Sequence, residues 1–151
     1  MKKDKITKVL IALDYDVTSK KVAGEGYLLA KSMGAETILL HVISELPVYY
    51  SESNYTHEYK VDLLGDLKVT TQAFLDKAKK QLGDEAIQTV LKEGEIADTI
   101  LKTAKEMDVD IIVVGSHSRK WLENIIGSQA EDVLTNSLIP VLIVPIKKKE
   151  D

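Results

Sequence analysis

Short apolar runs alternate along the chain with longer stretches in which apolar residues recur every three or four positions. A short apolar run is typical of a buried β-strand, and the longer period is typical of an amphipathic helix. The apolar runs predict strands over residues 8–13, 37–42, 86–91, 110–114 and 141–144. The helical period predicts helices over residues 18–33, 61–82, 95–107 and 128–136. We interpret the polar, tyrosine-rich residues 44–58 as a connection.

Strict alternation of strands and helices predicts an α/β fold with right-handed crossovers. We therefore expect a doubly wound parallel sheet of five strands, with helices on both faces. The first, fourth and fifth predicted strands are nearly all apolar. Such runs are typical of central strands, which are buried on both sides. No repeat, linker or low-complexity segment divides the chain, so residues 1–151 are interpreted as one domain.

The first predicted helix contains two glycines, Gly24 and Gly26. Each costs roughly 1 kcal/mol relative to alanine in a helix interior. They indicate either a close approach to a neighbouring element or only a weak helix. Asp16 or Thr18 is the expected N-cap of this helix, and Gly34 is the expected stop.

Composition excludes several classes of function. The chain has no cysteine, so disulfides, thiol catalysis and cysteine-bound metals are excluded. The net charge is -4 and the lysines are spread along the chain, which argues against a nucleic-acid-binding face. No segment approaches the roughly 20 apolar residues of a membrane span. The apolar run at residues 9–13 is too short for a signal peptide, so we expect a cytoplasmic protein.

Ligands of open parallel sheets bind at the carboxyl ends of the strands, where the winding direction reverses. The loop after the first predicted strand has neither a Gly-x-Gly-x-x-Gly motif nor a Walker lysine, which argues against a dinucleotide or P-loop site. Asp14 and Asp16 in this loop could hold a magnesium ion or a ribose hydroxyl. Alternatively, Asp16 caps the first helix and Asp14 is a polar strand end.

The sequence offers no clear catalytic or metal-binding residues. His41 lies in the second predicted strand and is interpreted as a satisfied, semi-buried side chain. His57 lies in the tyrosine-rich connection, and only His117 lies in a candidate loop. Because the three are not clustered, no zinc site is predicted. No serine stands in a nucleophile-elbow motif, so that type of hydrolase has no support.

The loop after the fourth predicted strand runs from Gly115 to Gly127. It leads into Ser128, which with Glu131 fits the capping-box pattern Ser-x-x-Glu. The same helix start offers free N–H groups and a positive dipole end to an anion. Gly127 would let a phosphate approach those groups, because it has no Cβ. A capped turn and a phosphate site are therefore both open.

Four segments of the chain resemble the universal stress protein family. They are KVLIALDYDVTSKKV (8–22), ILLHVISE (38–45), VDIIVVGSHS (109–118) and IPVLIVPI (139–146). Many members carry Gly, two residues, Gly, nine residues, Gly and then Ser or Thr before the last helix. Here Ser118 replaces the second glycine, and eight residues separate it from Gly127. The loop is therefore one residue shorter than the family pattern.

The resemblance implies the strand order 3-2-1-4-5, homodimers and a role in stress survival. In the nucleotide-binding branch the ligand is ATP, so the resemblance implies ATP or another adenine nucleotide, with or without Mg²⁺. The residues that would frame adenine and ribose are Ala12, Asp14 and Val42. Those that would frame the phosphates are Gly115, His117, Gly127, Ser128 and Gln129, with Arg119 to neutralise charge.

Two functions therefore remain open. The first is a regulatory protein that binds an adenine nucleotide, with at most very slow ATP hydrolysis. The alternative is a homodimeric stress-response interaction protein whose degenerate site does not bind ATP. A receiver-like domain would need an aspartate after the third strand, where the chain offers only Glu93. In either case we expect a homodimer through the edge strand 141–144, whose unpaired main chain invites pairing with a second copy.

Overall fold

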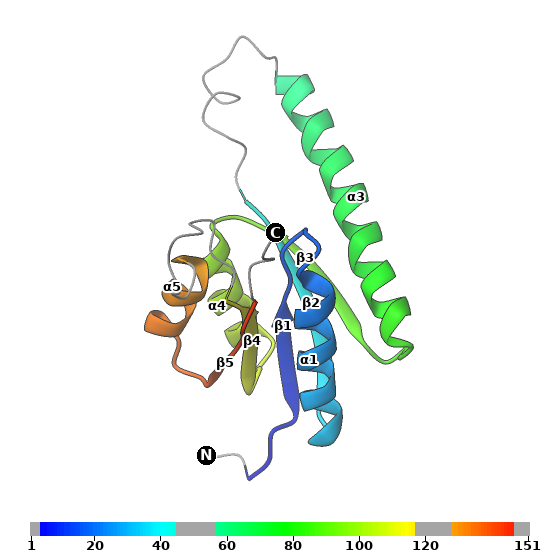
Figure 1. The fold of residues 1–151 in the computed structure, drawn as a ribbon. Coiled ribbons are helices and arrows are strands. Elements are labelled where there is room, and N and C mark those ends of the chain that lie inside the picture. The colour runs from blue at the N-terminus through cyan, green and yellow to red at the C-terminus, as the bar shows by residue number, and fades with distance from the viewer. Residues whose placement is uncertain (1–3, 45–56, 117–127, 147–151) are drawn as a thin grey trace, which may run out of the picture.

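The computed structural model describes residues 4–44, 57–116 and 128–146. Within these residues, five parallel strands form one sheet in the order β3-β2-β1-β4-β5, which confirms the predicted order (Figure 1). The strands are β1 (Lys8–Ala12), β2 (Glu36–Ile43), β3 (Gln88–Glu93), β4 (Ile111–Gly115) and β5 (Val141–Val144). The helices are α1 (Ser19–Ser32), α3 (His57–Leu82), α4 (Ile96–Glu106) and α5 (Ser128–Asn136).

Helices cover both faces of the sheet, as the alternation predicts. Leu10 and Ile11 are consecutive in β1 and are fully buried on opposite faces. Leu10 belongs to the core under α4 and α5, which includes Ile100 and Val133. Ile11 belongs to the core under α1 and α3, which includes Leu75. None of the described helices is both long and apolar enough to cross a membrane.

One inference about the sheet is wrong. Its apolar composition suggests that β5 is a central strand, but β5 lies at the edge of the sheet, as the order 3-2-1-4-5 predicts, and pairs only with β4 among the described strands. Its Leu142 is 39% exposed. The central strands are β2, β1 and β4. An apolar run is therefore compatible with an edge strand, and it does not by itself show that both faces are covered.

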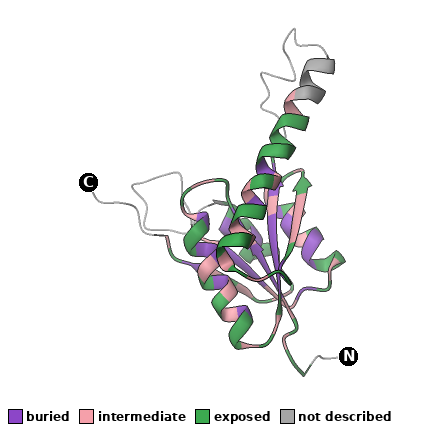
Figure 2. Cartoon of the chain, turned by 90° about the vertical axis from the view of Figure 1, so that its right-hand side faces the viewer, coloured by how far each residue is buried: buried purple, intermediate pink, exposed green. Residues whose placement is uncertain are grey.

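Most boundaries agree with the prediction to within one residue, but the strand β3 and the start of α3 differ by two residues or more. β3 starts at Gln88 rather than at residue 86, because Asp84 closes a turn: its Oδ1 accepts the N–H of Ala86 at 2.9 Å. The main-chain oxygen of Asp84 also accepts the N–H of Ile87 at 3.2 Å. α3 starts at His57, so the last two residues of the expected connection are helical. The apolar period missed this start, because residues 57–60 are His, Glu, Tyr and Lys and carry no apolar repeat. The outer part of α3 extends beyond the sheet, and residues 65–70 are exposed (Figure 2).

Candidate functional site

The loops that follow β1 and β4 both start at the carboxyl ends of the parallel strands, on the same side of the sheet. The two strands are adjacent and parallel, with Leu10 opposite Ile112 and Ile11 opposite Val113. The chain continues from β1 into α1 on one face, whereas α5, which follows β4, covers the other face. The winding direction therefore reverses between these strands, which is where open α/β sheets bind ligands. Asp14 and Gly115 both lie at the carboxyl ends of these strands, as the fold prediction requires.

The strand ends of β1 and β2 contribute the two apolar residues of the candidate site. Val42 is 7% exposed and belongs to the core under α4 and α5. Ala12 is half-buried and packs against the same core. The ladder continues past β1, because the N–H of Leu13 donates to the main-chain oxygen of Leu40 at 2.8 Å. Ala12 and Val42 therefore have a structural role that does not depend on a ligand.

Asp16 holds the start of α1. Its Oδ1 accepts the N–H of Thr18 at 2.8 Å and also the Thr18 hydroxyl. Its main-chain oxygen accepts the Ser19 hydroxyl at 2.8 Å. Thr18 is the N-cap residue, and its own side chain makes no capping hydrogen bond. Of the two alternatives for Asp16, its contacts favour helix capping. Asp14 is exposed, and its main-chain oxygen accepts the N–H of Asp16 at 2.9 Å.

Three aromatic rings gather beside this loop. Tyr15 packs on Phe74 of α3 with ring centroids 4.9 Å apart, and His41 of β2 lies edge-on to both rings. His41 is half-buried and its Nδ1 lies 2.7 Å from the main-chain oxygen of Leu13. The interpretation of His41 as a satisfied, semi-buried side chain is therefore confirmed. Sequence reasoning missed Tyr15 and Phe74, because no local signal links residues this far apart.

Gly115 has a packing role. A Cβ built on it would lie 2.9 Å from Cγ2 of Val22 in α1 and 3.4 Å from Cγ1 of Ile146. The next residue is tied to the end of β5: Ser116 donates its N–H to Val144 at 2.9 Å and accepts the N–H of Ile146 on its hydroxyl at 2.8 Å. The first glycine of the candidate loop therefore permits the close approach of α1, whether or not a phosphate binds.

The remaining predicted phosphate residues are only partly described. His117, Arg119 and Gly127 lie outside the described residues, as does Ser118. α5 begins at Ser128 as predicted, and Gln129 is exposed in its first turn. The capping-box interpretation depends on the side chain of Ser128, which also lies outside the described part. Within the described ranges, no three His, Asp or Glu side chains come together in a way that could hold a metal ion.

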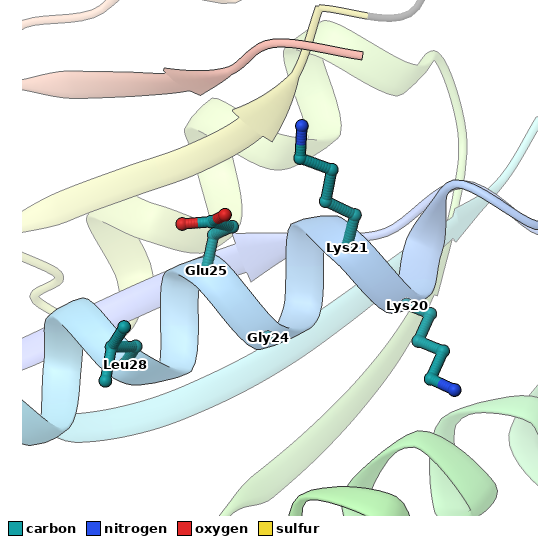
Figure 3. Close-up of a pocket in the computed structure, with 5 residues that line it drawn as sticks. All are labelled: Lys20, Lys21, Gly24, Glu25 and Leu28. Carbon is teal, nitrogen blue, oxygen red and sulfur yellow. The ribbon is translucent and has the colours of Figure 1, made fainter. Parts of the chain in front are cut away.

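A shallow hollow lies along α1, starting near the N-terminal end of the helix (Figure 3). It is centred on Gly24, whose missing side chain leaves a gap between the side chains around it, and it is lined by Lys20, Lys21, Gly24, Glu25 and Leu28. Lys21 donates from Nζ to the main-chain oxygen of Pro145 at 2.8 Å. None of the residues that line the hollow is among those predicted for the nucleotide site.

A doubly wound sheet whose first and fourth strands end side by side defines a class of α/β proteins. Members of this class bind ligands in the crevice at the carboxyl ends of those strands. The sequence profile of the universal stress protein family matches residues 5–145. The chain belongs to this family.

Similar proteins cover nearly the whole chain. The chain is 35% identical to universal stress protein YxiE of Bacillus subtilis (strain 168), over 91% of this chain and 97% of that protein. The solved structure of protein MJ0577, from Methanocaldococcus jannaschii, has a TM-score of 0.77 and 29% identity, over 95% of this chain and 99% of that one. A universal stress protein solved in complex with cAMP has the same fold, with a TM-score of 0.68 and 20% identity, over 94% and 98% of the two chains.

Proposed function

We propose that this protein is a stress-response regulatory protein that binds an adenine nucleotide in the crevice between the ends of β1 and β4. The observation that carries the proposal is that Asp14, just after β1, and Gly115, the last residue of β4, lie at the ends of two adjacent strands where the winding direction reverses. A protein of the same fold binds cAMP, an adenine nucleotide. We further propose that the protein acts in the cytoplasm, where adenine nucleotides are abundant.

In this proposal each part of the nucleotide meets a different strand end. Adenine and ribose lie against Ala12, Asp14 and Val42, with the Asp14 carboxylate accepting ribose hydroxyls or holding a magnesium ion. The phosphates lie on the loop that follows β4 and on the first N–H groups of α5. A helix N-terminus stabilises an anion by about 0.3–1 kcal/mol. The residues proposed for the phosphates are Gly115, His117, Arg119, Gly127, Ser128 and Gln129.

We propose binding rather than catalysis, with at most very slow ATP hydrolysis. Asp16 is engaged with the start of α1 through the N–H and hydroxyl of Thr18, and His41 is engaged with Leu13. These contacts leave neither side chain an evident role as a general base for water. A regulatory protein needs only a bound state that differs from its empty state, and slow hydrolysis would be compatible with that role.

The first test is isothermal titration of the wild-type protein with ATP and magnesium. We expect measurable heat, and we expect Gly127→Ala to abolish binding while the protein stays folded, because the added Cβ meets the phosphate. Gly24→Ala is the matched control, because no atom lies within 4 Å of the Cβ it adds. Ser118→Gly with one residue inserted before Gly127 should tighten binding. No heat and no thermal shift at millimolar ATP would leave the second candidate function.

The second candidate is a homodimeric interaction protein with an empty nucleotide site. It is favoured by three exposed leucines in the last part of the described chain: Leu134 of α5 is 46%, Leu138 is 102% and Leu142 of β5 is 39% exposed. Exposed apolar patches mark interaction sites. We propose that two copies pair through β5 under either function, since Pro140 and Pro145 limit the pairing to a short stretch. A twofold pairing closes the assembly.

A further inference from the structure

A histidine of β2 holds the main chain of the loop that follows β1. His41 Nδ1 lies 2.7 Å from the main-chain oxygen of Leu13. Because a carbonyl oxygen can only accept, Nδ1 must carry the hydrogen of this bond. The neutral ring therefore has one defined tautomer, set by its partner in the main chain.

Two aromatic rings restrict the orientation of the imidazole. Phe74 of α3 lies edge-on to it, with centroids 6.0 Å apart and an interplanar angle of 75°. Tyr15 of the loop also lies edge-on, at 6.3 Å and 61°. These are geometries that aromatic pairs prefer. The packing already fixes the ring, so its N–H points toward Leu13 before a ligand binds. Little further rotational freedom of the ring is therefore lost on binding.

The hydrogen bonds on either side of Asp14 hold its main chain. The N–H of Leu13 donates to Leu40 at 2.8 Å, and the oxygen of Leu13 accepts from His41. Because the peptide bond is planar, the direction of the Leu13 oxygen sets the plane of the peptide that joins Leu13 to Asp14. On the other side, the oxygen of Asp14 accepts the N–H of Asp16 at 2.9 Å.

We infer that His41 is a positioning residue of the nucleotide site, which acts through the Leu13 oxygen to set the direction in which Asp14 presents its carboxylate. The inference rests on the proposed function. His41 itself does not contact the nucleotide in this arrangement. Its contribution is preorganisation: a carboxylate that already points at the ribose or the magnesium ion loses less freedom on binding.

The test compares Mg-ATP affinities of His41 variants by titration calorimetry. His41→Leu replaces the imidazole with an apolar side chain that still fills part of its space and removes the donor, so affinity should fall about tenfold, the equivalent of one hydrogen bond. His41→Asn is the conservative variant, because its Nδ2 is bonded to Cγ as Nδ1 is in histidine. It should therefore recover affinity to within about threefold of wild type, or roughly 0.6 kcal/mol.

A double-mutant cycle separates positioning from general destabilisation. Asp14→Ala removes the group that His41 is inferred to orient, so His41→Leu should cause no further loss of affinity in that background. Equal losses in the wild-type and Asp14→Ala backgrounds would overturn the inference. So would full affinity in His41→Leu, or an imidazole whose ¹⁵N shifts show the hydrogen on Nε2 of the wild-type protein.

The outcomes also separate this inference from the proposed function. If the wild-type protein does not bind Mg-ATP, the proposed function fails and the role of His41 fails with it. If the wild-type protein binds and His41→Leu binds equally well, only the role of His41 fails. Should His41→Leu not fold, His41→Gln moves the donor one bond further from the main chain, and the same tenfold loss is expected of it.

Discussion

Gly26 of α1 lies directly against Ile11 of β1. A Cβ built on Gly26 would be 2.7 Å from Cδ1 of Ile11, 2.9 Å from its Cγ1 and 3.3 Å from Cγ1 of Val113. Gly24, two residues earlier in the helix, has no atom within 4 Å of the same position. The sequence left two explanations open for this pair. Gly26 marks the close approach of α1 to the sheet, whereas Gly24 only weakens the helix.

Alanine should therefore have opposite effects at the two glycines. Gly26→Ala should lower the free energy of unfolding by about 1–3 kcal/mol, because the added Cβ overlaps Ile11, which is fully buried in the close-packed core. Gly24→Ala should raise it by roughly 1 kcal/mol through helix propensity alone. Urea unfolding of both variants against wild type measures the two differences. Similar effects of both substitutions would contradict the assignment.

Asp84 should make stability depend on pH in the acid range. The N–H of Ala86, at 2.9 Å, and the hydroxyl of Tyr27, at 2.8 Å, hold the pKa of this carboxyl below its ordinary value. A carboxyl whose pKa is lower in the folded than in the unfolded protein stabilises the fold at pH values above its unfolded pKa. For aspartate the unfolded pKa is about 3.9. That stability is lost as the pH falls through the folded pKa. Asp84→Ala should therefore be less stable than wild type at neutral pH, and the difference should shrink below about pH 4.

Two variants sharpen the test at Asp84. In Tyr27→Phe the carboxyl loses one partner, so the pKa of Asp84, followed by NMR, should move back toward its ordinary value. The same hydrogen bond raises the pKa of Tyr27 in the wild-type protein. Glu85→Ala changes the neighbouring exposed carboxylate and serves as the control. A difference between Asp84→Ala and wild type that stays constant from pH 7 to pH 3 would refute this account.

A substitution at Gly115 should act first on packing. Gly115→Ala places its Cβ 2.9 Å from Cγ2 of Val22, which is buried and stiff about χ1, so the cost should be about 1–3 kcal/mol. Val22→Ala removes that methyl group, and the double variant should lose less stability than the sum of the two single variants. Thermal or urea unfolding measures the coupling. If the effects add without coupling, Val22 is not the reason for a glycine at this position.

The proposed dimer should depend on the surface of β5. Leu142→Asp should yield monomers, because it puts a charge on an exposed apolar surface whose burial contributes roughly 25 cal/mol per Å². Ile143→Asp should also yield monomers, but it should lower stability as well, because Ile143 packs against the core under α4 and α5. Leu28→Asp is the control, since Leu28 is a 67% exposed leucine of α1 on a different surface. Sedimentation equilibrium of the three variants and wild type measures the assembly. A wild-type protein that sediments as a monomer at micromolar concentration would rule the dimer out.

Much of the local structure was encoded by the sequence itself. α5 and β5 have the predicted bounds, because Gly127 precedes the helix and two prolines flank the strand. The class of fold followed from the alternation of two periods. The order of the strands required the family resemblance, because an apolar period shows which residues face a core but not which strands pair. The nucleotide residues also came from the resemblance, and they remain predictions.

Only the tertiary structure decided the contacts between distant parts of the chain. It separated Gly24 from Gly26, since the difference depends on how closely α1 approaches Ile11. It also left Leu142 of β5 exposed and brought His41 to Leu13. Local patterns record the environment of a residue on one element, whereas packing distances and hydrogen bonds across elements depend on how all the elements are placed together.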